Sequence, residues 1–322
     1  MEYGFSIPTR GPLARRDIID AICERGEALG YQYFAIPDHI IIPGRIDSRY
    51  PYNESGDYPG SDTGECMEQL TLMAYLAATT TTAKLLSSVM VVPHRGAVHT
   101  AKTIATIDQL SGGRAVIGVG AGWMREEFEA LGAPDFDRRG RVTDEYLEAF
   151  KVLWTEDDPR YEGEFVRFRD VTFSPKPQQR PYPPIWVGGE SGPALRRTAR
   201  LGDVWFPIGS NPRHPLNTPQ RFADGVAGLR GACEKQGRNP DEVGLALWSN
   251  FYTEDKLVEL DTGERHMFTG ADEQIAEDVV SMREQGVDAL LFNFQRASLE
   301  STLASMERFA ETVLPQAGES LR

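Results

Sequence analysis

The amino-acid sequence predicts an α/β fold, a (β/α)8 TIM barrel with insertions in its loops. Eight short runs rich in apolar and β-branched residues recur along the 322 residues, and stretches of helical periodicity separate them. Most of these runs are almost continuously apolar, which is typical of parallel strands that are buried on both faces. Eight strand-then-helix units favour the barrel over a doubly wound sheet, which usually has fewer strands and a nucleotide-binding glycine motif after the first one. No such motif follows Ile7.

The predicted strands follow the apolar runs in order. They are Tyr3–Ile7, Tyr33–Ile36, Leu85–Val92, Ala115–Val119, Pro184–Val187, Val204–Pro207, Val243–Trp248 and Ala289–Phe292. Between the strands, apolar residues three and four positions apart mark helix faces, as in Leu299, Leu303, Met306, Ala310 and Val313. These faces place helices around the outside of the sheet.

Three polar segments exceed what a plain barrel needs. A barrel takes about 250 residues. The excess fits insertions at Ile40–Glu65, Thr155–Pro183 and Ser249–Phe268, which together hold 75 residues. The first and third follow strands, on the face where such barrels carry their chemistry. Because the first is long and rich in Tyr, Pro, Gly and Asp, we expect a lid over the substrate, with a decorative loop as the alternative. We expect one domain over residues 1–322.

Composition excludes several classes of function. The formal charge of −14 argues against nucleic acid as a partner, because phosphate binding needs a basic face. No apolar run is long enough to span a membrane and no signal-peptide pattern opens the chain, so we expect a cytoplasmic protein. The five histidines and three cysteines show no metal-ligand spacing, and we therefore expect no metal site.

Polar residues at the ends of the predicted strands are the candidate site, since barrel enzymes carry their chemistry there. Asp38 and His39 follow the second strand. A histidine in this position can transfer a proton, and a neighbouring carboxylate can bias its charge. The alternative is a pair that only caps the strand end.

Glycines mark two further strand ends. Gly188-Gly189-Glu190-Ser191 opens a helix, and backbone N–H groups at a helix N-terminus bind anions such as phosphate. A tight turn with Ser191 as the N-cap is the alternative. Gly118-Val119-Gly120 leaves room for a flat ring against the backbone, and Trp123 either stacks on such a ring or packs in the loop.

Taken together and in this order, these motifs resemble the bacterial luciferase-like flavin or deazaflavin oxidoreductases. The resemblance covers essentially the whole chain and is carried by residues 35–39 (AIPDH), 102–114 (KTIATIDQLSGGR), 118–123 (GVGAGW), 126–128 (EEF) and 183–189 (PPIWVGG). It implies a (β/α)8 barrel with a flavin-type ring at its C-terminal mouth. The sequence is most similar to the branch that uses coenzyme F420, with FMN as the alternative cofactor.

The resemblance also implies roles for particular residues. Asp38 and His39 match the pair that faces the ring, with Asp38 orienting His39 and His39 transferring or stabilising a proton while a hydride moves. Ser88-Val89 lies where the family often has a non-prolyl cis peptide bond and a bulge behind the ring. Gly188-Gly189-Glu190-Ser191 matches the backbone cradle of the cofactor phosphate, which a Glu190 side chain facing inward would oppose.

Two features depart from the family's pattern. Ala121 stands where the F420-dependent sugar-phosphate dehydrogenases have a glutamate acid, which puts sugar-phosphate oxidation in doubt. His94 and Arg95 replace a more apolar segment, so we expect one of them to touch the substrate or the cofactor tail. Arginines near the mouth would favour the anionic glutamyl tail of F420, and the candidates are Arg45, Arg49, Arg196 and Arg197.

The predicted function is an F420-dependent oxidoreductase that transfers a hydride between C5 of the deazaflavin and a small organic substrate. One alternative is an FMN-dependent monooxygenase supplied by a separate reductase. The alternatives from other classes are a metal-dependent barrel isomerase or aldolase, and a barrel that binds flavin without turnover. The resemblance implies a homodimer, with the helices after the second and third strands as candidate interfaces.

Overall fold

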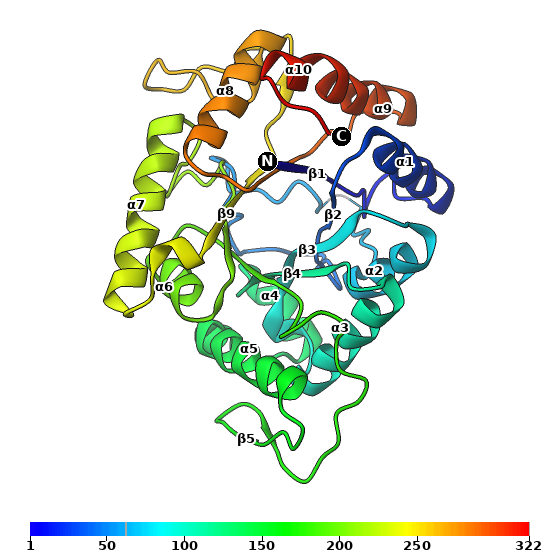
Figure 1. Cartoon of the computed structure of the whole chain (residues 1–322), viewed down its shortest axis with the longest axis vertical. Coiled ribbons are helices and arrows are strands. Elements are labelled where there is room, and N and C mark those ends of the chain that lie inside the picture. The colour runs from blue at the N-terminus through cyan, green and yellow to red at the C-terminus, as the bar shows by residue number, and fades with distance from the viewer. Residues whose placement is uncertain (62, 322) are drawn as a thin grey trace.

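The computed structural model describes residues 1–61 and 63–321 and contains a closed barrel of eight parallel strands (Figure 1). Around the barrel the strand order is β1-β2-β3-β4-β7-β8-β9-β12, and β12 pairs with β1. The strands are β1 (Glu2–Ser6), β2 (Tyr33–Ile36), β3 (Lys84–Val91), β4 (Ala115–Gly120), β7 (Ile185–Gly188), β8 (Val204–Phe206), β9 (Gly244–Ser249) and β12 (Ala289–Phe292). All eight predicted strands are confirmed, and every boundary lies within one residue of its predicted position.

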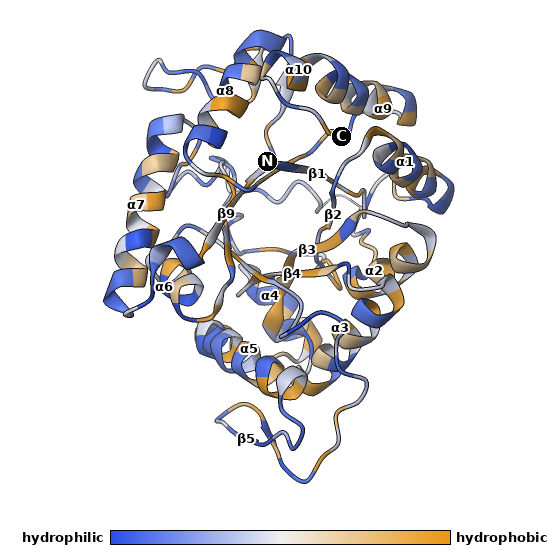
Figure 2. Cartoon of the chain, viewed as in Figure 1, coloured by the Kyte–Doolittle hydropathy of each residue, from blue (hydrophilic) through white to orange (hydrophobic). Residues whose placement is uncertain are grey.

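Helices surround the strands and turn their apolar faces inward, as the hydropathy colouring shows (Figure 2). They are α1 (Arg16–Leu29), α2 (Gln69–Thr79), α3 (Ala97–Ser111), α4 (Arg125–Leu131), α5 (Arg139–Thr155), α6 (Gly192–Leu201), α7 (Pro219–Lys235), α8 (Asp272–Glu284), α9 (Leu299–Arg308) and α10 (Leu314–Gln316), with a π-helical turn at Phe309–Val313. The predicted (β/α)8 barrel is therefore the observed fold.

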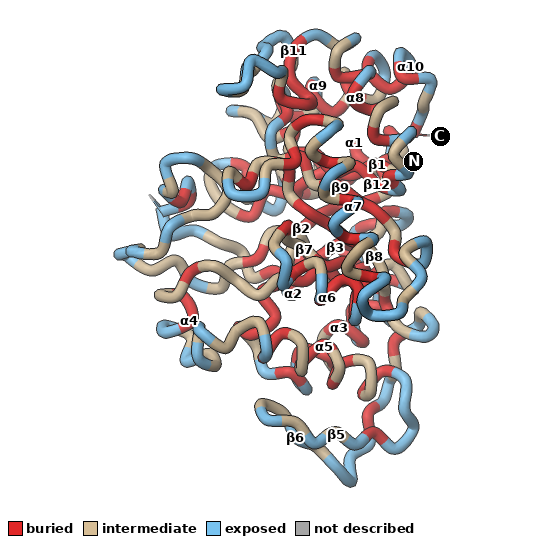
Figure 3. The backbone as a smooth tube through the Cα atoms, turned by 90° about the vertical axis from the view of Figure 1, so that its left-hand side faces the viewer, coloured by how far each residue is buried: buried red, intermediate tan, exposed pale blue. Residues whose placement is uncertain are grey.

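Two apolar layers hold the barrel together. The inner layer fills the space between the strands with large rings: the centroids of Tyr33 and Trp186 lie 5.0 Å apart, and those of Trp186 and Phe206 lie 5.3 Å apart. The outer layer packs the other face of each strand on the helices. Because strand residues alternate between the two layers, the strands read as continuous apolar runs. Residues of the strands are accordingly mostly buried (Figure 3).

Two of the three insertions leave the C-terminal end of the barrel, and the second does not. The first, with Pro37–Glu68 between β2 and α2, is called the lid here; residue 62 lies outside the described residues. The second forms a hairpin of β5 (Tyr161–Glu162) and β6 (Arg167–Phe168) that projects away from the barrel (Figures 1 and 3). The third follows β9 and carries β10 (Thr253–Glu254) and β11 (Thr269–Gly270). Only the first and third leave the C-terminal ends of strands, where a site is expected.

Candidate functional site

The mouth of the barrel, at the C-terminal ends of the strands, has a floor made of small residues. Gly120 ends β4 and Gly188 ends β7, and the side chain of Val89 on β3 lies over both. A Cβ atom added at Gly120 would lie 2.8 Å from Cγ2 of Val89, and one at Gly188 would lie 3.1 Å from Cγ1. All three residues stay partly exposed, so this level surface is accessible from the mouth.

The backbone of β3 departs from a regular strand beneath this floor. The peptide bond between Ser88 and Val89 is cis, and the register of β3 against β4 shifts between Ser87 and Met90. Both features that the family resemblance implies for this pair are present. The irregular backbone comes close to β4, because a Cβ added at Gly118 would lie 2.0 Å from the carbonyl oxygen of Ser87. Only glycine fits at position 118.

Asp38 is a buried anchor between strands. Its carboxylate accepts the backbone N–H of Val91 at 2.8 Å and two guanidinium N–H groups of Arg95 at 2.9 and 2.8 Å. Arg95 also donates to Glu68 at 3.0 Å. These contacts correct two expectations: Asp38 does not orient His39, and Arg95 points to the buried carboxylate rather than to a ligand. Its fixed fork of N–H groups matches both carboxylate oxygens, which is why an arginine holds this position.

His39 has a different carboxylate partner, Glu127 in the first turn of α4. Nδ1 of His39 lies 2.8 Å from Oε2 of Glu127, while Oε1 of Glu127 accepts the backbone N–H of Ile40 at 2.9 Å. The side chain of Glu127 is 1% exposed and that of His39 is 16% exposed. Glu127 was not among the predicted site residues, although the EEF motif that contains it contributes to the family resemblance.

The charges around His39 favour an ionised Glu127. Burial raises the pKa of Glu127, but the hydrogen bond from His39, the charges of His39 and His94 and the N–H of Ile40 outweigh it and hold the pKa below its usual value. On the other side of Glu127, Nδ1 of His94 lies 3.9 Å from Oε1, too far for a hydrogen bond. Burial lowers the pKa of His94, and its side chain is only 1% exposed, so this ring does not reach a ligand.

The lid places aromatic side chains against His39 and Trp123. The ring of Tyr58 lies 5.0 Å from that of His39 and 5.5 Å from that of Trp123, and Tyr50 lies 5.2 Å from Trp123. Nη1 of Arg10, in the loop after β1, donates to the hydroxyl of Tyr58 at 2.6 Å. The first insertion therefore lies over the predicted site residues, and Trp123 is part of an aromatic cluster between the lid and the mouth.

Gly188-Gly189-Glu190-Ser191 joins β7 to α6 as predicted, with Ser191 at the N-cap and without a capping hydrogen bond from its side chain. Gly189 has a φ of +100°, a conformation that glycine adopts readily. No described residue accepts a hydrogen bond from the backbone N–H of Ser191. The side chain of Glu190 accepts the N–H of Ile208 at 2.7 Å and the side-chain amide of Asn211 at 2.9 Å. The carboxylate of Glu190 is thus held by the loop after β8 and by its own backbone N–H.

A basic cavity lies beside this cradle, between the first turns of α5 and α6. Its volume is about 320 Å³, and we call it the arginine cavity. It is lined by Asp137, Arg138, Gly140, Arg141, Asp144, Pro193, Arg196, Arg197, Arg200 and Gln236. Arg197 is buried against Asp144, but Arg196 is exposed and donates to no described residue. Arg138 and Arg141 pair with Glu164, and Arg200 pairs with Asp144 and Glu148, so Arg196 is the lining arginine without an ion-pair partner among the described residues.

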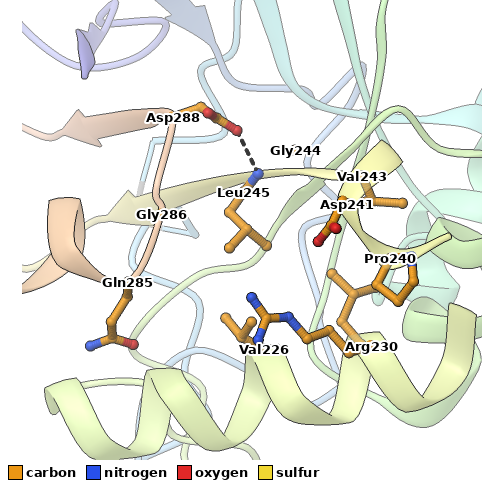
Figure 4. A pocket seen from close by; sticks show the side chains of 11 residues that line it. Val226, Arg230, Pro240, Asp241, Val243, Gly244, Leu245, Gln285, Gly286 and Asp288 are labelled. Carbon is orange, nitrogen blue, oxygen red and sulfur yellow. Dashed lines mark hydrogen bonds between the residues drawn. The ribbon is translucent and has the colours of Figure 1, made fainter.

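A second cavity of about 210 Å³ lies at the opposite end of the barrel, where Leu245 of β9 donates its N–H to Asp288 (Figure 4). Within residues 1–61 and 63–321, no three His, Cys, Asp or Glu side chains gather as a metal site. No helix there is long and apolar enough to cross a membrane.

Comparison with known proteins agrees with the geometry. The profile of the luciferase-like monooxygenase family matches residues 1–256. The FMNH2-dependent dimethylsulfone monooxygenase of Pseudomonas putida is 30% identical over 290 residues, which cover 77% of this chain and 78% of that protein.

Solved structures share the barrel. The monooxygenase RslO1 of Streptomyces bottropensis superposes with a TM-score of 0.73 at 21% identity, covering 98% of this chain and 99% of that one. The coenzyme F420-dependent tetrahydromethanopterin reductase of Methanopyrus kandleri gives a TM-score of 0.71 at 17% identity, covering 95% and 98%. The fold, the family profile and the dimethylsulfone monooxygenase agree: this chain belongs to the luciferase-like monooxygenase family and is an enzyme of its flavin- or F420-dependent oxidoreductase class.

Proposed function

We propose that the enzyme is an F420-dependent oxidoreductase that moves a hydride between the deazaflavin and a small organic substrate, with His39 as the proton-transfer group. The observation that carries the proposal is the His39–Glu127 pair beside a level, glycine-lined floor at the mouth. When bound there, the deazaflavin supplies C5 as the hydride acceptor or donor. The expected catalytic site consists of His39, with Asp38 as the buried anchor of the neighbouring strand.

The residues at the mouth fit a flat ring with a phosphate-bearing side chain. Val89, Gly120 and Gly188 present the level surface, and Trp123 belongs to the aromatic cluster between the lid and the mouth. The free N–H group of Ser191 and the N-terminus of α6 favour a phosphate, because an unpaired N–H donor and the helix dipole attract negative charge there.

His39 handles the proton that accompanies hydride transfer. If an alcohol is oxidised to a carbonyl, it loses a hydride from carbon and a proton from oxygen, and Nε2 of His39 accepts that proton. In the reverse direction Nε2 returns the proton to the carbonyl oxygen. The buried carboxylate of Glu127 stabilises the positive charge that the ring gains.

The arginine cavity supports F420 over FMN. F420 carries an anionic glutamyl tail beyond its phosphate, whereas FMN ends at the phosphate. The cavity lies next to the cradle, and the exposed Arg196 has no carboxylate partner among the described residues. Arg45 and Arg49 are weaker candidates for binding the glutamyl tail. Arg45 pairs with Asp47, and Arg49 donates a hydrogen bond to the backbone carbonyl of Glu54 inside the lid.

A reduced-FMN monooxygenase is the second candidate. The dimethylsulfone monooxygenase of P. putida, which is 30% identical over most of both chains, uses FMNH2. The floor and the cradle suit either ring, so the cofactor must be decided by binding.

The deciding experiment titrates the purified protein with F420 and, separately, with FMN, following fluorescence quenching. We expect micromolar or tighter binding of F420. Arg196→Glu should weaken F420 binding at least about tenfold by charge repulsion with the tail and leave FMN unchanged. Arg45→Glu is the control, because that side chain lies in the lid and is 84% exposed. Tight binding of FMN alone would move the enzyme to the monooxygenase branch.

The cradle is tested separately with Gly189→Asp, which should abolish binding of both cofactors by repelling the phosphate. Gly189→Asn is the matched control, since asparagine tolerates positive φ and is uncharged. If both variants bind equally, the phosphate lies elsewhere. Binding of neither cofactor to the wild-type protein would overturn the proposed function.

We also propose a homodimer. Val98 and Leu110 on α3 are 43% and 64% exposed, and a second copy is the expected cover for these apolar side chains. Light scattering should give twice the chain mass of 35.8 kDa, and Leu110→Glu should shift it toward one chain. A single-chain mass for the wild-type protein would contradict the proposal.

A further inference from the structure

We infer that Glu127 is the positioning residue of His39, fixing which ring nitrogen holds the proton and which faces the mouth. The inference rests on the proposed function in one respect, that His39 transfers the proton. The position that carries a glutamate acid in some family members holds Ala121 here, so the carboxylate beside His39 comes from a different place in the sequence, the first turn of α4.

Both carboxylate oxygens of Glu127 accept hydrogen bonds from residues at the start of the lid. Oε2 lies 2.8 Å from Nδ1 of His39, and Oε1 accepts the N–H of Ile40 at 2.9 Å and of Ile41 at 3.4 Å. One carboxylate therefore fixes both the ring and the backbone that follows it. An ionised carboxylate only accepts hydrogen bonds, so Nδ1 must carry the hydrogen.

Nε2, the other ring nitrogen of His39, is then the atom that exchanges a proton with the substrate. Nε2 lies on the opposite edge of the ring from Nδ1, and no described residue forms a hydrogen bond with it. It is not among the buried polar atoms that lack a partner, and the side chain of His39 is 16% exposed. With Nδ1–H held by Glu127, Nε2 of the neutral ring carries the lone pair that accepts a proton.

Neighbouring groups do not compete for this role. Asp38 is fully engaged by Val91 and Arg95. His94 is 3.9 Å from Glu127, and both of its ring nitrogens are buried without a partner. The only ring that donates a hydrogen bond to Glu127 among the described residues is therefore that of His39.

The adjacent residue provides a matched control. Oε1 of Glu126 accepts the backbone N–H groups of Asp47 and Ser48, each at 2.9 Å, so Glu126 holds a later part of the lid without touching His39. A variant at position 126 loosens the lid, whereas a variant at position 127 also releases the ring.

The test is a long-range proton–nitrogen NMR correlation on full-length protein labelled with ¹⁵N-histidine, recorded above neutral pH. His39→Gln identifies the His39 signals among the five histidines. We expect the wild-type ring to carry its hydrogen on Nδ1, Glu127→Ala to move it wholly or partly to Nε2, and Glu126→Ala to leave it on Nδ1. Wild-type His39 with its hydrogen on Nε2, or an equal change in both alanine variants, would overturn the inference.

A second variant covers the case in which Glu127→Ala does not fold. In Glu127→Gln the amide oxygen can still accept the N–H of Ile40, but the charge is lost. The Nδ1 signal of His39 should shift while the signals of His99, His214 and His266 stay in place. Once a substrate is found, kcat should fall on the order of 100-fold with KM nearly unchanged. An unshifted His39 signal in Glu127→Gln contradicts the inference.

The NMR readout separates this inference from the proposed function, because it needs neither cofactor nor substrate. A Nδ1–H ring that depends on Glu127, in a protein that binds neither F420 nor FMN, would retain the positioning role and refute the cofactor assignment. Tight F420 binding with a ring indifferent to Glu127 would do the reverse.

Discussion

The guanidinium of Arg95 forms a bidentate ion pair with the carboxylate of Asp38: Nη1 lies 2.9 Å from Oδ2 and Nη2 lies 2.8 Å from Oδ1. The Asp38 side chain is 0% exposed and that of Arg95 is 10% exposed. Together with the N–H of Val91, the ion pair ties the end of β2 to the end of β3, directly beside the cis peptide bond. Asp38, which the sequence predicts to take part in the reaction, thus stabilises the strand ends around the site.

Breaking this pair should be costly. Arg95→Met leaves the Asp38 carboxylate buried without its cation, and we expect the free energy of unfolding in urea to fall by about 3–5 kcal/mol. Arg45→Met, which breaks an exposed pair with Asp47, should change little. Adding Asp38→Asn to Arg95→Met should restore part of the loss. A loss below about 1 kcal/mol in the single variant would show that Asp38 finds another partner or a proton.

The floor of the mouth should behave as one packed unit. Gly120→Ala puts a Cβ 2.8 Å from Cγ2 of Val89, so we expect a loss of stability of about 1–3 kcal/mol. Val89→Ala removes the clashing methyl groups, and the double variant should lose clearly less than the sum of the two single changes. Thermal or urea unfolding of the four proteins measures this coupling. Additive losses would mean that Val89 does not lie over Gly120.

The strands could be predicted within one residue because each is an apolar run between turns, a signal that lies in neighbouring positions. The hydrogen-bond partners of the polar site residues could not be predicted from the sequence. Glu127 is 88 positions from His39 and Arg95 is 57 from Asp38, so only the folded barrel brings each pair together. Adjacency in the sequence wrongly suggested the Asp38–His39 pair. The direction of Glu190 was equally hidden, since its partners lie in the loop after β8.

The aromatic cluster should hold the lid closed. Trp123→Ala removes the rings' contacts with Tyr50 and Tyr58, and edge-to-face pairs of this kind contribute about 0.5–1.5 kcal/mol each. We expect limited chymotrypsin digestion to cleave the lid several-fold faster, with the barrel left intact. Tyr161→Ala is the control, because its stacking partner Phe168 lies in the distant β5–β6 hairpin. Equal digestion rates in both variants would show that Trp123 does not anchor the lid.

The carboxyl of Glu190 should leave a signature in the pH dependence of stability. Burial raises its pKa from 4.5 to about 6, against the lowering effect of the Ile208 N–H and the Asn211 amide. Because the folded state holds this proton more tightly than the unfolded chain, the contribution of Glu190 is fully present below the unfolded pKa and is lost as the pH rises through about 6.

Urea unfolding of the wild-type protein and Glu190→Gln between about pH 4 and pH 7 isolates this contribution, because glutamine does not titrate and all other groups cancel in the difference. The stability of the wild type relative to the variant should fall by about 2 kcal/mol over that interval, the equivalent of a shift of about 1.5 pKa units. A difference that stays flat would place the carboxyl in contact with water, and a difference that rises with pH would mean that its hydrogen bonds to Ile208 and Asn211 outweigh its burial.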